Sequence, residues 1–168
     1  MAEPLSTFTG DVAYLDAVAL ISHLDDGHPF HGPFSALLAR AVDPNDGFDL
    51  VTASLAFDEV EIVLLQELVA RPPFGVTRNR TEYLSRHPDV VRQLAKAVEP
   101  LLDSTKEIVS VESVTGDDIA AMAEAMRLHG MLPRDAIHLA VARRLGISAI
   151  VSAEEVFDRV PGIRLYKP

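Results

Sequence analysis

The sequence predicts a three-layer α/β/α fold around a central, mainly parallel sheet of about five strands. Short stretches rich in valine, isoleucine and leucine alternate along the chain with longer stretches whose apolar residues recur at helical spacing. Parallel strands need long crossover connections, and here those connections are helical. Of the 168 residues, 48% are hydrophobic, which is enough to bury a core without metal or disulfide support. We therefore expect one domain covering residues 1–168.

The first half of the chain contains two predicted strands, each of which leads into a helix. The first strand ends at Asp16, and the helix after it stops in the turn-forming residues 25–29. The helix after the second strand ends at Pro72 and Pro73, because proline lacks a backbone donor and clashes with the preceding turn. The predicted elements are a strand at 12–15, helices at 17–24 and 33–42, a strand at 48–52 and a helix at 54–70.

The second half begins with a helical excursion around residues 71–103. Residues 71–87 are polar and irregular, and Pro88 opens a helix that bends near Pro100. After the next strand, Gly130 ends one helix and Pro133 begins another. The later elements are a strand at 107–114, a helix from the cap at 115–118 to 129, a helix at 133–146, a strand at 148–151, a brief helix at 153–160 and a strand at 163–166.

Composition excludes several classes of function. The chain has no cysteine, so disulfides and thiolate ligands are ruled out and a metal would rest on oxygen or histidine nitrogen. The nine glycines form neither a dinucleotide-binding nor a Walker pattern, which excludes nucleotide-dependent oxidoreductases and ATPases. Residues Met1–Gly10 lack the basic flank and the long apolar run of a secretory signal or a membrane span, so we expect a cytoplasmic protein.

Charge is unevenly distributed along the chain. The formal net charge of −10 argues against a broad basic face for nucleic acid, because phosphate affinity comes largely from lysine and arginine. Cations bound among clustered acids would reverse the local field. A basic stretch lies elsewhere and consists of Arg71, Arg78, Arg80, Arg86 and Arg92.

Four acidic residues form the candidate site because of their positions relative to the strands. In an open parallel sheet, ligands bind beyond the carboxyl ends of the strands. Asp16 ends the first strand, and Glu59 lies within two turns of the second. Asp135 is in the first turn of a helix, and Glu154 follows the strand at 148–151.

Clustered carboxylates repel one another unless cations neutralise them, and all-oxygen ligands favour Mg²⁺ or Mn²⁺. Such ions can activate water for in-line attack on phosphorus.

Each of these acids also has a purely structural explanation, as a helix cap, as a partner of a helix dipole or as part of a solvated acidic run. The two acids after Ser152 can be told apart. Ser152 and Glu155 have the spacing of a capping box, so we assign Glu155 the structural role and leave Glu154 free.

Several segments resemble motifs of the PIN-domain family. Residues 14–21 resemble the opening motif, in which an aspartate ends the first strand, and residues 50–60 resemble the second, in which a helix presents a glutamate. Residues 132–142 are the strongest match, and residues 150–162 follow them at the family's usual spacing. The resemblance extends over most of the chain and is weak from 71 to 103.

The resemblance implies a PIN fold and, as in VapC-like toxins, a Mg²⁺- or Mn²⁺-dependent ribonuclease that forms a homodimer and is neutralised by a cognate antitoxin protein. The family's acidic positions fall on Asp16, Glu59, Asp135 and Glu154. Two departures from the family pattern concern activity. Val18 replaces a residue that is usually polar, and Glu154 and Val156 stand where two aspartates are common. Asp158 is the alternative fourth acid, although it matches a structural position of the family.

Several histidines and arginines could also bind a metal or a phosphate, but most of them have a simpler structural explanation. His138 lies three residues after Asp135 and could bind metal or phosphate, but packing beside the acids is favoured. His23, His28 and His31 lie in or beside a turn rich in glycine and proline, which indicates a solvated loop. The arginines that could contact RNA phosphates are Arg134, Arg143 and Arg144, with Arg134 favoured because it neighbours Asp135.

The leading hypothesis is an endoribonuclease toxin that acts on an RNA substrate. The alternative is a catalytically weakened PIN-like module that binds a protein or RNA without cleaving it. A receiver-like or phosphatase-like domain is more distant, because such domains need a late lysine and both Lys106 and Lys167 are poorly placed.

Overall fold

The computed structural model describes residues 1–168 and contains one six-stranded sheet with the strand order β1-β6-β5-β2-β3-β4. Every strand pair is parallel. The strands are β1 Glu3–Pro4, β2 Val12–Leu15, β3 Asp49–Ala53, β4 Val109–Glu112, β5 Ala149–Val151 and β6 Arg164–Lys167. The predicted fold class is confirmed. The strand missed by sequence reasoning is β1, whose two residues carry no pattern and are ordered by pairing with β6.

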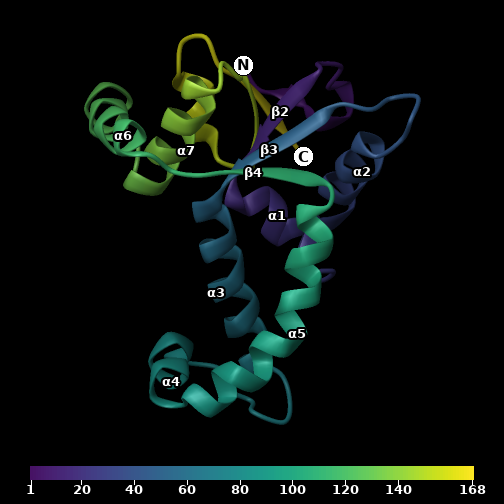
Figure 1. Cartoon of the computed structure of the whole chain (residues 1–168), viewed down its shortest axis with the longest axis vertical. Helices are drawn as coiled ribbons and strands as arrows, with labels where there is room; N and C mark the ends of the chain where they lie inside the picture. Colours follow the sequence, from purple (N-terminus) through teal and green to yellow (C-terminus); the bar gives the residue numbers. More distant parts are fainter.

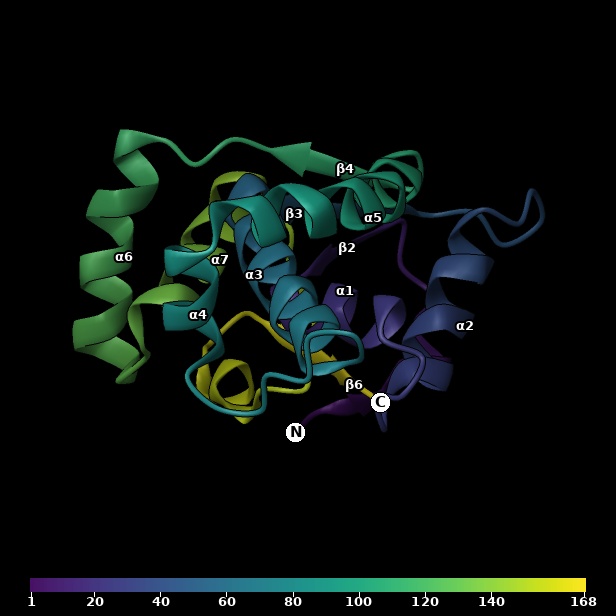
Figure 2. The same cartoon turned by 90° about the horizontal axis from the view of Figure 1, so that it is seen from below.

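Helices cover both faces of this sheet. They are α1 Ala17–Leu24, α2 His31–Ala41, α3 Ser54–Ala70, α4 Arg80–Arg86, α5 Pro88–Lys106, α6 Gly116–His129 and α7 Pro133–Arg144, with the short 3-10 helices η1 Leu5–Thr7 and η2 Glu155–Arg159. One apolar cluster, which includes Leu20 and Val60, packs α1, α2, α3 and α5 against one face. A second, which includes Leu139 and Phe157, packs α6, α7 and η2 against the other (Figure 2). None of the helices combines the length and apolar character needed to cross a membrane.

The central strand β2 pairs with β3 on one side and β5 on the other, so Tyr14 lies level with both Val51 and Ile150. From β2 the chain moves outward through β3 to β4, and it then returns to place β5 and β6 on the opposite side. The strand order therefore reverses at β2, and in such sheets a crevice forms at the carboxyl ends of the strands. The segments that leave β2, β3 and β5 at this edge carry Asp16, Glu59 and Glu154.

The helices α3 and α5 extend away from the sheet, and α4 lies at their far end (Figure 1). We call residues 71–98 the arm tip. A separate apolar cluster, made of Val69, Leu84, Val90 and Leu94, joins α3, α4 and α5 there. The prediction of irregular structure at 71–87 is wrong for Arg80–Arg86, because α4 forms around the buried Leu84, whose burial depends on neighbouring helices and not on a local periodic pattern.

Arg144 holds a buried carboxylate in place between α6 and α7. Its Nε donates to both carboxylate oxygens of Asp118, at 2.9 and 3.1 Å, and the Asp118 side chain is only 2% exposed. Burial would raise the pKa of Asp118, but the hydrogen bonds from Arg144 and Thr115 hold it below its usual value. Asp118 also closes the predicted cap at 115–118, where it accepts from the Thr115 backbone N–H at 2.8 Å.

Replacing Arg144 with leucine should therefore lower the unfolding free energy, because it leaves the carboxylate of Asp118 without its charged partner. Urea unfolding measures this loss. The matched control is Arg143→Leu, since Arg143 is exposed and adjacent, and its substitution should change stability by less than about 0.5 kcal/mol. Equal effects of the two substitutions would show that the Asp118 contact contributes little.

Candidate active site

Asp16 follows β2 directly and caps the first turn of α1. Its Oδ1 accepts a hydrogen bond from the backbone N–H of Ala19 at 3.1 Å, and its Oδ2 accepts one from the hydroxyl of Ser152. The residue is 5% exposed. Burial raises the pKa of Asp16 to about 7, against the opposing effect of the Ser152 hydrogen bond. The capping role is thus present, and the same side chain is an acid that water cannot solvate well.

Ser152, at the end of β5, connects two of the candidate acids. Its hydroxyl donates to Asp16, and the same oxygen accepts the backbone N–H of Glu154 at 2.8 Å. The predicted capping box is wrong, because Glu155 lies at the surface and pairs with Lys167 at 3.1 Å. Ser152 therefore orients Asp16, and Glu154 lies exposed at the edge of the site.

Asp135 lies in the first turn of α7, which Pro133 opens. Burial raises the pKa of Asp135, and the carboxylates of Glu154 and Glu59 raise it further. Glu154 also raises the pKa of Asp16. At the carboxyl edge of the sheet, the charge of Glu154 thus acts on both Asp16 and Asp135, and the charge of Glu59 acts on Asp135.

Glu59 lies in the second turn of α3, and its side chain is 13% exposed. Its Oε2 is 2.8 Å from Nη1 of Arg134, and its Oε1 is 3.7 Å from Nε2 of His138. Burial alone would raise the pKa of Glu59, but His138 and Arg134 hold it below its usual value. Both Oε1 of Glu59 and Nε2 of His138 are buried without a hydrogen-bond partner. Oε1 is therefore a buried acceptor that remains available to a donor or a cation.

A contact with Tyr14 fixes the orientation of the His138 ring. The Tyr14 hydroxyl lies 2.8 Å from Nδ1 of His138, and both residues are buried. Burial raises the pKa of Tyr14, so the phenol keeps its proton and can donate to Nδ1. With Nδ1 accepting from Tyr14, the ring N–H of His138 is on Nε2, which faces Glu59. Sequence reasoning missed Tyr14, although it lies two residues before Asp16 and so on the same side of β2.

The chemistry of the site fits a hard divalent cation, because its acids supply only oxygen ligands and Oε1 of Glu59 lacks a partner. As the side chains stand, no three acidic or histidine residues lie close enough together to hold one ion. Glu59 contacts Arg134, and Asp16 is bonded to Ser152. Ion binding would therefore require these side chains to turn away from their present partners.

Other sequence candidates lie apart from these acids. Arg144 is engaged by Asp118 and is not available to a phosphate without breaking that pair. The carboxylate of Asp158 lies 3.0 Å from the amino terminus, in keeping with a structural role. Nδ1 of His23 lies 2.9 Å from the hydroxyl of Ser35, so this histidine contacts a neighbouring helix.

Comparison with protein families finds a match to the PIN domain over residues 13–163. A comparison with curated proteins finds no match. The matched span contains all of the candidate acids.

Solved structures with a similar fold include toxins and toxin–antitoxin complexes. VapC20 of Mycobacterium tuberculosis, a toxin that cleaves the sarcin-ricin loop, is 18% identical with a TM-score of 0.54, covering 87% of this chain and 92% of that one. A toxin–antitoxin complex from Klebsiella pneumoniae is 17% identical with a TM-score of 0.54, covering 90% and 94%. VapBC2 of Rickettsia felis, bound to a promoter DNA fragment, is 13% identical with a TM-score of 0.54, covering 93% and 98%. At these identities the likeness concerns the fold.

Proposed function

The chain belongs to the PIN-domain family, and we propose that it is a metal-dependent endoribonuclease, the toxin of a type II toxin–antitoxin pair. One observation carries the proposal: Asp16 is buried at the carboxyl end of the central strand, within electrostatic reach of Glu154. A carboxylate buried beside other acids costs stability unless a cation compensates its charge. We also propose that residues 1–168 form a single PIN-like domain, with the helical excursion around 71–103 as part of it.

The proposed ligands of Mg²⁺ or Mn²⁺ are Asp16, Glu59, Asp135 and Glu154. When bound, such ions supply Lewis-acid chemistry, which lowers the pKa of water and stabilises charge on phosphate oxygens. Ser152 orients Asp16 through its hydroxyl. His138, whose ring is held by Tyr14, faces Glu59 and limits its rotation. Arg134 is 59% exposed at its side chain, so it can leave Glu59 and contact an RNA phosphate.

The proposed partners are an RNA substrate, a cognate antitoxin and a second copy of the chain. Support for the antitoxin comes from the toxin–antitoxin complexes among the similar structures. The contact between Arg134 and Glu59 illustrates how an antitoxin arginine could neutralise these acids. Support for a homodimer comes from the apolar side chains of Ile119 and Leu132, which are 56% and 72% exposed on and beside α6 and α7.

A second candidate function is a PIN-like module that binds a protein or RNA without cleaving it. The observation that favours it is the absence of any three acids close enough to share an ion as they stand. Val18 and Glu154 also depart from the family pattern. Such a module would bind its partner equally well with and without divalent ions.

Cleavage of labelled RNA tests the nuclease proposal. We expect cleavage in Mg²⁺ or Mn²⁺, none in EDTA, and a rate lower by about 10²- to 10³-fold for Asp135→Asn. The control is Asp158→Asn, which removes an exposed carboxylate next to the family motif and should keep the rate within about twofold of the wild type. Cleavage that persists in EDTA, or an Asp135→Asn variant as active as the control, would contradict the proposal.

A further inference from the structure

Basic residues gather at the arm tip, which lies at the far end of α3 from the sheet (Figure 1). Residues 71–98 contain six lysines or arginines and two aspartates or glutamates, whereas the whole chain contains 15 and 25. The arm tip is therefore a positively charged region on a protein whose formal net charge is −10.

Three of these basic residues form no ion pair within the protein. Arg78, Arg92 and Lys96 are exposed and take part in none of the ion pairs of the protein. Arg80 differs, because its Nη1 binds Glu67 at 2.6 Å and thereby ties α4 to α3. Single exposed arginines are ordinarily just solvated, whereas several free cations in one region attract an anion together.

Two of the free cations lie on an ordered helix. Arg92 and Lys96 are one turn apart on α5, on the side opposite the buried Val90 and Leu94. Val90 and Leu94 belong to the apolar cluster that joins α3, α4 and α5. The spacing of the two cations is therefore set by the helix and by its packing, which suits a ligand with regularly spaced negative charges.

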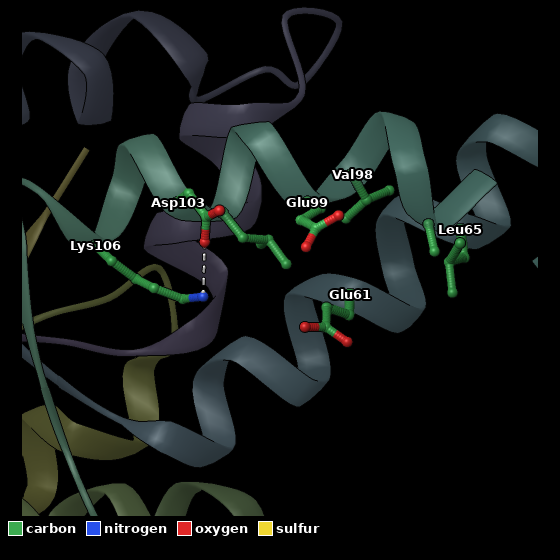
Figure 3. A pocket seen from close by; sticks show the side chains of 8 residues that line it. Glu61, Leu65, Val98, Glu99, Asp103 and Lys106 are labelled. Carbon is green, nitrogen blue, oxygen red and sulfur yellow. Dashed lines mark hydrogen bonds and ion pairs between the residues drawn. The ribbon is translucent and has the colours of Figure 1, made fainter. Parts of the chain in front are cut away.

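The groove between α3 and α5, which begins beside Ala95 and Val98 of the arm tip and continues past Asp103, has the opposite charge. It has a volume of about 360 Å³ and is lined by Glu61, Glu99 and Asp103 together with apolar side chains (Figure 3). Lys106 pairs with Asp103 at 3.1 Å, which leaves the groove with excess negative charge. This groove repels phosphates, so the arm tip is a separate basic surface and not one end of a continuous basic track.

We propose that the arm tip binds the phosphate backbone of the RNA substrate at a distance from the scissile bond. Along α3, Glu59 and Ala70 are about 16 Å apart, at ~1.5 Å per residue. At ~3.4 Å per stacked nucleotide step, this distance corresponds to about five steps, and an extended strand covers it in fewer. Phosphate contacts add affinity and register but do not read sequence. The inference rests on the proposed function and adds that substrates are RNAs of sufficient length.

A charge-neutralising variant tests this surface. The tip variant carries Arg78→Gln, Arg92→Gln and Lys96→Gln. The control variant carries Arg127→Gln, Arg159→Gln and Arg164→Gln, which remove the same charge from exposed arginines elsewhere that also form no ion pair. Fluorescence anisotropy in EDTA measures the Kd for a labelled RNA hairpin of about 20 nucleotides over a range of KCl concentrations.

We expect the tip variant to bind the hairpin roughly 10- to 100-fold more weakly than the wild type, with a salt slope smaller by about 2–3. The control variant should bind within about twofold of the wild type. Equal affinities of the two variants, or no binding by the wild type, would overturn the proposal. So would a tip variant that keeps its RNA affinity but loses binding to poly-glutamate, since the surface would then suit an acidic protein.

A short substrate separates this proposal from the nuclease proposal. A dinucleotide has a single phosphodiester bond and therefore no second phosphate to place on the arm tip, so the tip variant should cleave it at the wild-type rate. A wild type that binds the hairpin through the arm tip but cleaves no RNA would contradict the nuclease and leave the binding surface in place. A tip variant that cleaves the short RNA at a reduced rate would place the three cations at the site of cleavage and overturn the remote contact.

Discussion

Replacing Asp16 with asparagine should abolish most RNA cleavage and make the metal-free protein more stable at neutral pH. Asparagine can still accept the Ala19 N–H on its Oδ1, so the start of α1 should be preserved, and its amide NH2 would donate to the Ser152 oxygen in place of accepting from the hydroxyl. It lacks the charge that would hold a cation, and the cleavage rate should fall by about 10²- to 10³-fold. Cleavage of labelled RNA in Mn²⁺ measures the first effect.

The stability effect follows from the pKa of Asp16, which burial raises from 3.8 to about 7 in the folded protein. The folded state then holds the proton more tightly than the unfolded state, so the favourable contribution of protonated Asp16 is full below about pH 4 and is lost as the pH rises through about 7. The loss is on the order of 4 kcal/mol. Urea unfolding in EDTA should therefore show Asp16→Asn gaining about 3–4 kcal/mol over the wild type near pH 8, and little near pH 4.

The control is Asp49→Asn, because Asp49 is an exposed acid at the amino end of β3, the opposite edge of the sheet. Its substitution should leave the cleavage rate unchanged and alter stability by less than about 0.5 kcal/mol. An active Asp16→Asn protein, or one less stable than the wild type near pH 8, would show that Asp16 serves only to cap α1.

Mn²⁺ should stabilise the wild type strongly. At a concentration about 100 times its Kd, a ligand of the folded state adds about 2.7 kcal/mol, which for a domain of this size raises the Tm by about 5–10 °C. The shift should disappear in Asp135→Asn and persist in Asp49→Asn. Thermal unfolding by circular dichroism, with and without Mn²⁺, measures it.

This stabilisation should weaken as the pH falls from about 8 to 6, because carboxylates must lose their protons before they bind a metal. Burial raises the pKa of Asp16 to about 7, so protons compete with the ion for this carboxylate in that range, and burial shifts the pKa of Asp135 in the same direction. A Tm that Mn²⁺ leaves unchanged at every pH would instead favour the module that binds without cleaving.

Local patterns were sufficient for the elements that carry most of the candidate site. The strand Val12–Leu15 and the helices Ala17–Leu24 and Ser54–Ala70 have the predicted bounds, because strand alternation, a capping aspartate and paired prolines are all local signals. They place Asp16 and Glu59 correctly relative to the strands. The general rule for parallel sheets then brings their ends together.

The remaining features depend on contacts between residues far apart in the chain. Ser152 lies close enough to Asp16 to bond it only because β5 pairs with β2, so its spacing to Glu155 pointed to the wrong partner. The bond between Tyr14 and His138 likewise needs α7 to pack on the sheet. Helix α4 depends on an apolar cluster shared by three helices, and a seven-residue segment carries too short a pattern to reveal it.

Crystals soaked in Mn²⁺, with anomalous diffraction recorded near the manganese edge, test most directly whether the acids at the end of the central strand hold divalent ions. We expect a manganese peak within bonding distance of carboxylate oxygens of Asp16 and Asp135, with Arg134 turned away from Glu59. No peak at this edge of the sheet, or a peak only in the groove lined by Glu61, Glu99 and Asp103, would contradict the proposed metal-dependent site.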